Sequence, residues 1–188
     1  MSESEWESLH PRDAAGILHS LDAPWWIAGG WSFDLFLGRQ LRPHKDLDVA
    51  VLRRDQRRVF DALPDWELAV AHDGALEPWD GSLLPDDRHG IWARPRGAER
   101  WRLELVLDEA DGETWHYRRD ARVTRPLASL GAVRGGLVPE IALLYKAREA
   151  GHEVDWDAVL PQLDEPARAW LADAVATAHP ESPYLERF

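Results

Sequence analysis

The sequence predicts a mixed α/β (α+β) fold, in which a mixed β-sheet flanked by helices is followed by a C-terminal helical segment. Two observations support this. Short apolar runs with strand character alternate with helical patterns up to residue 125. After Arg125-Pro126, helical patterns alone follow. We therefore expect an α/β core over residues 1–130 and a helical cap over residues 131–188.

The predicted core begins with a helix, a strand and a second helix. Residues 4–20 carry apolar side chains at helical spacing, which predicts the first helix. The apolar run at 25–28 stops at Gly29-Gly30, which is typical of a buried strand that ends in a tight turn. Ser32 is a candidate cap for the second helix, and Gly38 is expected to close it.

The rest of the core consists mainly of predicted strands. The β-branched run at 47–52 predicts a strand, and 53–63 reads as a helix. Further strands are expected at 66–70, 90–94, 101–107 and 114–118, separated by turns that contain glycine.

The C-terminal segment is predicted to be helical throughout. Pro139 suits the first turn of a helix over 140–149, and helices at about 155–163 and 165–178 follow. These three segments form the predicted cap.

Charge and composition exclude several classes of function. The chain has 22 basic and 34 acidic residues, a formal net charge of −12, and no cysteine. The charge argues against non-specific binding to nucleic acid and favours a cationic partner, unless it serves solubility alone. Lack of cysteine excludes disulfides, thiolate zinc sites and a cysteine nucleophile. The N-terminus is acidic and polar, unlike a signal peptide, and no apolar run is long enough to span a membrane, so we expect a cytoplasmic protein.

Asp46 and Asp48 are the first candidate functional residues. Residues i and i+2 of a strand point to the same face, so the two carboxylates are expected to project together. Adjacent ionised carboxylates repel each other unless a cation lies between them. Mg²⁺ commonly takes one or two carboxylates together with the phosphates of a nucleotide. The pair therefore predicts a Mg²⁺ site.

A second Asp-x-Asp pair shows that the motif alone is weak evidence for a metal site. Asp155 and Asp157 open a predicted helix, where residues i and i+2 diverge by roughly 200°. We interpret that pair as a helix cap and a first-turn acid.

The segment before Asp46 suits a phosphate. Gly29 and Gly30 lack a Cβ, so the backbone can approach an anion closely, and Ser32 with the first N–H groups of the next helix can donate to it. Isolated, such a turn is an ordinary strand-to-helix connection; followed by the acids, it predicts phosphate binding. Lys45, in the basic run before the acids, and Lys146 on the 140–149 helix are further candidates for phosphate contact, although Lys146 fits a solvated helix face equally well.

A third carboxylate is expected on the 101–107 strand. Glu104 and Asp108 share one face, but they lie about 13 Å apart along a strand and cannot both reach one metal ion. Glu104 lies among apolar neighbours, where an unpaired charge is costly, whereas Asp108 opens an acidic turn. We favour Glu104 and leave Asp108 open as the alternative.

The segment that contains these glycines and aspartates resembles the opening of small antibiotic nucleotidyltransferases, which belong to the nucleotidyltransferase superfamily. The resemblance is to the aminoglycoside 2″-adenylyltransferase and lincosamide nucleotidyltransferase group in particular, and the segment reads WWIAGGWSFDLFLGRQLRPHKDLDVAVLRRD. The segments WRLELVLDEADGETWHYRRD, PEIALLYKARE and DWDAVLPQLDEPARAWL resemble the same group, so the likeness covers most of residues 24–175.

The resemblance implies a nucleotidyltransferase fold, Mg²⁺, and ATP or another nucleoside triphosphate as co-substrate. It matches Gly29, Gly30 and Ser32 to the phosphate turn and Asp46 and Asp48 to the metal ligands. The group often has aspartate as the third acid, where this chain offers Glu104 or Asp108. Lys146 and Asp155 match a lysine and a later acid in the helical part.

Two functions follow as hypotheses. The first is a Mg²⁺-dependent enzyme that moves a nucleoside monophosphate, AMP from ATP in the first instance, to a hydroxyl of a small cationic molecule such as an aminoglycoside-like antibiotic. The alternative is a non-catalytic nucleotide- or ligand-binding protein on the same scaffold. The acceptor, the preferred nucleotide and the oligomeric state are left open by the sequence.

Overall fold

A computed structural model describes residues 5–7, 9–131 and 135–188, and its contacts divide the chain into two compact units. Unit 1 comprises Met1–Ile27 and His44–Glu109, and unit 2 comprises Ala28–Pro43 and Ala110–Phe188. The helix that follows Ala28 is thus grouped with the C-terminal helices. The expectation of a core over 1–130 and a cap over 131–188 stays a prediction.

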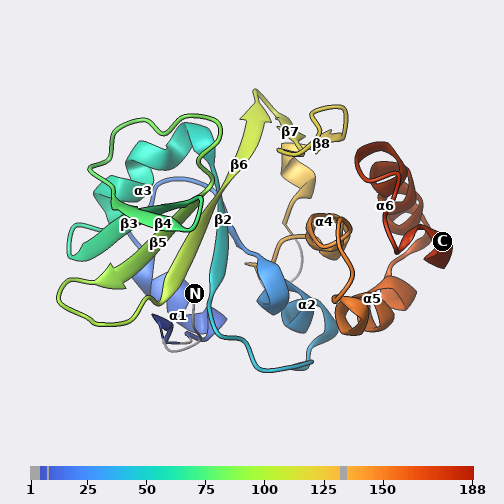
Figure 1. The fold of residues 1–188 in the computed structure, drawn as a ribbon, viewed down its shortest axis with the longest axis horizontal. Coiled ribbons are helices and arrows are strands. Elements are labelled where there is room, and N and C mark those ends of the chain that lie inside the picture. Colours follow the sequence, from blue (N-terminus) through green and yellow to red (C-terminus); the bar gives the residue numbers. More distant parts are fainter. Residues whose placement is uncertain (1–4, 8, 132–134) are drawn as a thin grey trace. The chain divides into compact units, whose positions relative to one another are not determined.

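Unit 1 is built on a mixed sheet (Figure 1). Its strands lie in the order β1-β2-β6-β5-β3-β4; β2 and β6 are parallel, and the other neighbours are antiparallel. Its elements are α1 (Pro11–Ile17), β1 (Trp25–Ile27), β2 (Asp48–Leu52), η2 (Arg53–Asp55), α3 (Gln56–Ala62), β3 (Trp66–His72), β4 (Ala75–Pro78), β5 (Gly90–Pro95) and β6 (Leu103–Asp111), whose last two residues belong to unit 2.

The core of unit 1 follows from the alternation of side chains along its strands. Leu103, Leu105 and Leu107 of β6 are fully buried, whereas Glu104 and Val106 between them are half-buried. Successive residues of a strand point to opposite faces, so one face of β6 packs into the core and the other can carry polar groups. The sequence pattern therefore decides which face of the sheet is available for chemistry.

Unit 2 is mainly helical (Figure 1). Its elements are α2 (Gly29–Leu37), β7 (Thr114–His116), β8 (Thr124–Pro126), η3 (Leu127–Ser129), α4 (Pro139–Tyr145), α5 (Glu153–Val159), η5 (Leu160–Gln162), α6 (Glu165–Ala178) and η6 (Leu185–Arg187). Helix α4 is buried along almost its whole length and packs against α2, α5 and α6. Its buried residues are apolar except for Glu140, whose carboxylate pairs with Arg125.

The structure corrects several predicted boundaries. The first helix is shorter than the predicted 4–20, of which residues 4 and 8 lie outside the described residues. It begins at Pro11, where His10 accepts a hydrogen bond from the backbone N–H of Arg12 and so caps the first turn. The strand predicted at 101–107 is displaced to Leu103–Asp111. Strands β4 and β8 are additional, and the helix predicted over 140–149 ends at Tyr145.

The interpretation of Ser32 as a helix cap is wrong. Helix α2 begins three residues earlier, and Ala28 occupies its N-cap. The first residue of this helix has a φ of 57°, in the left-handed region, and Gly29 adopts it without strain because it has no Cβ. The prediction that Gly38 closes the helix is confirmed, since Gly38 is a left-handed C-cap.

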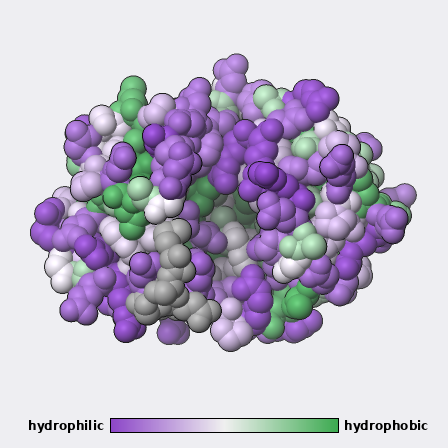
Figure 2. Space-filling model, viewed as in Figure 1, coloured by the Kyte–Doolittle hydropathy of each residue, from purple (hydrophilic) through white to green (hydrophobic). Residues whose placement is uncertain are grey.

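Hydrophilic side chains dominate the face of the molecule in Figure 2. In the part of the chain that the structure describes, we find no helix with the length and apolar character needed to cross a bilayer.

Candidate metal centre

The pairing of β2 with β6 brings two predicted site residues together. Asp48 and Glu104 are direct partners in the parallel register of these strands. Neighbouring strands are about 4.8 Å apart, so two side chains opposite each other on one face are close neighbours. The next pair along, Val49 and Leu105, is fully buried on the other face. Both carboxylates therefore project from the same, half-buried face of the sheet.

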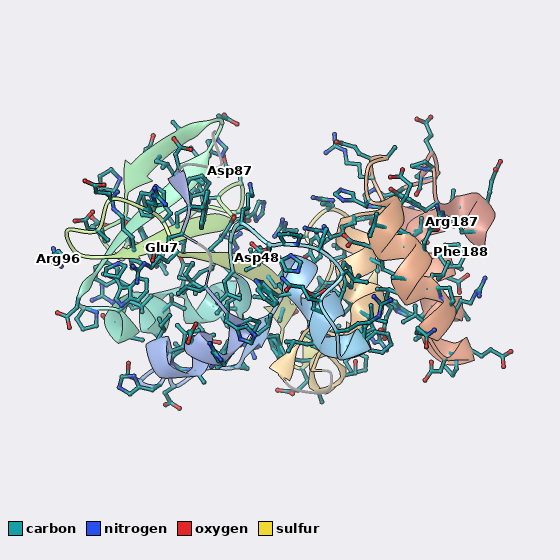
Figure 3. All side chains as sticks on the ribbon, turned by 90° about the horizontal axis from the view of Figure 1, so that it is seen from below. Glu7, Asp48, Asp87, Arg96, Arg187 and Phe188 are labelled. Carbon is teal, nitrogen blue, oxygen red and sulfur yellow. The ribbon has the colours of Figure 1, made fainter. Side chains whose placement is uncertain are left out.

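Asp46 completes a cluster of three carboxylates. It lies just before β2, which begins at Asp48 (labelled in Figure 3), and all three side chains are half-buried. One carboxylate oxygen from each of Asp46, Asp48 and Glu104 lies within 4.8 Å of the others. Among the described residues, this is the one group of at least three histidine, cysteine, aspartate or glutamate side chains that meets so closely.

The chemistry of these donors fits a hard divalent cation. All three groups offer carboxylate oxygens, the ligands that Mg²⁺ prefers, and there is no sulfur or imidazole donor in the cluster. Lys45 reaches Asp46 with its ammonium group at 3.6 Å, but its side chain is 60% exposed. An ion pair so open to water is weak.

Asp108 occupies a different place from Glu104. It is the partner of Leu52 in the β2–β6 register, four residues along the strand from Glu104, and is 1% exposed. The expectation that Asp108 opens an acidic turn is wrong, because β6 continues through Asp111. Asp108 thus lies outside the carboxylate cluster.

This geometry gives a first testable prediction. Glu104→Gln removes a charged ligand and is expected to weaken the binding of Mn²⁺, used as a spectroscopic substitute for Mg²⁺, by at least about 10-fold. Asp108→Asn is expected to leave Mn²⁺ binding within about 2-fold of the unchanged protein, because its side chain is about 13 Å away along the strand. Electron paramagnetic resonance of free Mn²⁺ measures both. A larger effect of Asp108→Asn than of Glu104→Gln would contradict the assignment.

The predicted phosphate turn lies in unit 2, at the start of α2. The Ser32 hydroxyl donates a hydrogen bond to the carbonyl oxygen of Gly29 at 2.7 Å, and Ser32 is 1% exposed. Its proton is therefore engaged within the first turn of the helix. The roles of Gly29, Gly30 and Ser32 toward a phosphate stay predictions.

Lys146 shares a buried carboxylate with a second cation. Its ammonium nitrogen lies 3.4 Å from Oδ2 of Asp155, and a guanidinium nitrogen of Arg42 lies 3.4 Å from the same oxygen. Helix α5 begins at Glu153 with His152 as its N-cap, so neither aspartate of the second pair is a helix cap as predicted; Asp155 is a first-turn acid, and its side chain is 3% exposed. The carboxylate therefore orients two cations.

In the sequence, Arg42 is one member of the basic run that precedes Asp46, with Arg39, His44 and Lys45. Its segment is tied to α2 because the backbone N–H of Leu41 donates to the Asp34 side chain at 3.0 Å. His152 lies just before α5 and is near the same charged groups. The pKa of its imidazole is lowered first by burial and then by the charge of Lys146. We therefore expect His152 to be neutral at pH 7.

The chain matches a family of known proteins. The family model described as aminoglycoside-2″-adenylyltransferase matches residues 12–153, which is more than half of the chain. No curated protein sequence gives a match.

The solved structures that are similar to this chain include two of antibiotic-modifying proteins. The crystal structure of ANT(2″)-Ia in complex with adenylyl-2″-tobramycin has 16% sequence identity and a TM-score of 0.59, over 88% of this chain and 95% of the other. It supports a shared fold, so the predicted nucleotidyltransferase-type α/β fold is confirmed. The lincomycin-bound lincosamide antibiotic adenylyltransferase LnuA has 14% identity and a TM-score of 0.49, over 89% and 98% of the two chains.

Proposed function

Because the chain belongs to the aminoglycoside-2″-adenylyltransferase family, and is thus a nucleotidyltransferase as its sequence indicated, we propose that it uses Mg²⁺ to transfer AMP from ATP to a hydroxyl group of a small cationic acceptor of the aminoglycoside class. The observation that carries this proposal is the cluster of Asp46, Asp48 and Glu104. Its oxygen donors suit the metal that such a transfer requires.

The three carboxylates have distinct roles in this proposal. Asp46 and Asp48 hold the metal, and a bound Mg²⁺ supplies positive charge that offsets the charge of the triphosphate. Glu104 completes the ligand set and accepts the proton of the acceptor hydroxyl. The oxygen of the acceptor hydroxyl forms a bond to the α-phosphorus of ATP. At the same time the bond between the α-phosphorus and the oxygen that bridges it to the β-phosphorus breaks, and pyrophosphate leaves. Catalysis then depends mainly on positioning and on charge neutralisation.

We assign nucleotide binding to five residues outside the metal ligands. Gly29 and Gly30 offer backbone N–H groups at the start of a nine-residue helix, where the helix dipole favours an anion. Ser32 holds this first turn in shape, because its backbone N–H donates to the carbonyl oxygen of Ala28 and its hydroxyl donates to that of Gly29. Lys45 and Lys146 carry compact positive charges suited to phosphate oxygens. In support of Lys146, Asp155 limits the freedom of its side chain, so less conformational entropy is lost when it binds an anion.

The charge of the protein supports a cationic acceptor. With a formal net charge of −12, the chain attracts polycations at long range, which raises the rate of encounter with an amine-rich molecule. The same charge weighs against a nucleic acid as the acceptor. A cytoplasmic location, where ATP is supplied, belongs to the same proposal.

An assay of pyrophosphate release tests the proposal. The protein is incubated with Mg²⁺, each of the four nucleoside triphosphates in turn, and a panel of aminoglycosides and lincosamides. We expect release with ATP and at least one aminoglycoside, dependent on the divalent metal and lost on adding a chelator. Nucleotide binding without release on any acceptor would instead support the alternative of a non-catalytic binding protein. If the protein neither binds a nucleotide nor depends on a divalent metal, the assignment of the site is overturned.

A further inference from the structure

Gly90, at the start of β5, lies beside the carboxylate of Glu104. A Cβ added to Gly90 would lie 2.9 Å from Oε1 of Glu104 and 3.9 Å from its Cδ. The nearest other atom is Cβ of Ala71 on β3, at 3.8 Å, an ordinary van der Waals distance. Within unit 1, then, a side chain at position 90 would collide with one group, the third carboxylate of the cluster.

The sheet explains this approach. In the antiparallel pairing of β5 with β6, Glu104 lies opposite Trp92, and Gly90 lies opposite Val106. Gly90 and Trp92 are two residues apart, so they share a face with Glu104, and Gly90 is its diagonal neighbour. Trp92 is 5% exposed, so the space directly opposite Glu104 is occupied. The carboxylate instead extends over the position that has no side chain.

The backbone does not itself require glycine at this position. The φ of Gly90 is not among the positive values that favour glycine. Glycine inside a strand usually weakens it, because glycine gives the unfolded chain more freedom and has no side chain to pack against neighbouring strands. The reason for glycine must therefore lie in what its missing Cβ leaves open.

We propose that Gly90 is a positioning residue for the reaction: it leaves the space that the longer side chain of Glu104 needs to bring its carboxylate to Asp46 and Asp48. This inference rests on the proposed metal site. The three acids have oxygens within 4.8 Å of one another. A methyl group at residue 90 forces the Glu104 carboxylate to rotate away from its present place, and the ligand set is then disturbed.

The length of Glu104 gives the inference its sharpest consequence. Aspartate ends one methylene closer to the backbone, so its carboxylate does not reach the space over residue 90. Gly90 and Glu104 are therefore a matched pair: alanine at 90 is harmful with glutamate at 104 and neutral with aspartate there. The effects of the two changes should not add, as expected for residues in contact.

The test is a double-mutant cycle on the full chain. Gly90→Ala, Glu104→Asp and the double variant are compared with the unchanged protein, by binding of Mn²⁺ alone in electron paramagnetic resonance and by thermal unfolding. We expect Gly90→Ala to weaken Mn²⁺ binding about 10-fold, as is typical when a ligand loses its support. The double variant should match Glu104→Asp within about 2-fold.

Gly16→Ala is the matched control, because a Cβ at Gly16 would have no neighbouring atom within 4 Å. It should bind Mn²⁺ as the unchanged protein does. Gly90→Ala/Glu104→Ala covers the case in which Gly90→Ala folds poorly. Since the methyl group collides with Glu104 alone, this variant should unfold at the temperature of Glu104→Ala or slightly above it, because alanine reduces the freedom of the unfolded chain.

The outcomes separate this inference from the proposed function. If Glu104→Ala weakens Mn²⁺ binding but Gly90→Ala does not, the role of Gly90 is overturned and the metal site stands. An equal loss from Gly90→Ala with either glutamate or aspartate at residue 104 also overturns it. If the unchanged protein binds no Mn²⁺, the metal site itself fails, and the role of Gly90 fails with it.

Discussion

Asp48→Asn is expected to lower kcat/KM for nucleotidyl transfer by about 10³-fold, which corresponds to about 4 kcal/mol of lost transition-state stabilisation. Asp48 is the member of the cluster at the first position of β2, directly beside Glu104 in the parallel register. Asparagine has nearly the same size and leaves the strand intact, but it removes one negative charge. The loss should therefore appear in catalysis and metal binding while the unfolding temperature changes little.

The chain supplies a matched control in Asp157→Asn. Asp157 belongs to the other Asp-x-Asp pair, on α5, where its exposed side chain pairs with Arg187 (labelled in Figure 3). This substitution has the same chemistry in a different structural context and is expected to leave kcat/KM within about 2-fold. Equal activity of Asp48→Asn and Asp157→Asn in the pyrophosphate assay would refute the role of Asp48.

Asp155→Asn is expected to have the largest effect on stability, lowering the free energy of unfolding by about 3 kcal/mol. The Asp155 carboxylate is buried and holds Lys146 and Arg42, each at 3.4 Å. A neutral side chain leaves two cations facing each other without their counter-charge. The estimate is at the lower end for a broken buried ion pair because Arg42 is 40% exposed and keeps part of its hydration. The unfolding temperature should fall by about 6 to 12 °C.

Asp157→Asn serves again as the control, two residues further along the same helix. Its carboxylate is 65% exposed, so its loss should shift the unfolding temperature by no more than about 2 °C. If Asp155→Asn unfolds at the temperature of Asp157→Asn, the buried carboxylate does not hold unit 2 together. Restoring the temperature by Asp155→Asn/Arg42→Met would support repulsion between the two cations as the cause, because that change removes one of them.

The sequence singled out the three carboxylates that lie close together in the structure, because the evidence for them is local. Alternation along a strand placed Asp46 and Asp48 on one face, and the same rule placed Glu104 on the face of β6 that does not carry the leucines. The register between β2 and β6 decides which of their residues are partners. Local sequence patterns do not reveal that register, because it depends on tertiary packing. The pairing of Asp48 with Glu104 therefore came from the structure.

Asp108 shows how local evidence misleads. The residues that follow it, Glu109-Ala110-Asp111-Gly112, have the composition of a turn. The strand nevertheless continues through Asp111, and Asp108 is buried. Tertiary pairing overrides weak local preference in strands, because most of their stability comes from neighbours.

Asp155 marks another limit. Its position in the first turn of a helix was readable from the sequence, but its burial and its partners were not. Arg42 lies 113 residues earlier in the chain, and the contact depends on how α2 and α5 pack within unit 2. Spacing rules apply within one element and do not extend to pairs brought together by the fold.

The mass of an aminoglycoside after incubation with the protein, Mg²⁺ and ATP tests the central claim most directly. We predict that the mass increases by one adenylyl group with the unchanged protein and with Asp157→Asn, and that it does not increase with Asp48→Asn or when Mg²⁺ is chelated. An equal amount of adenylylated product from Asp48→Asn, or no product on any aminoglycoside from a folded protein that binds Mn²⁺ and ATP, would contradict it.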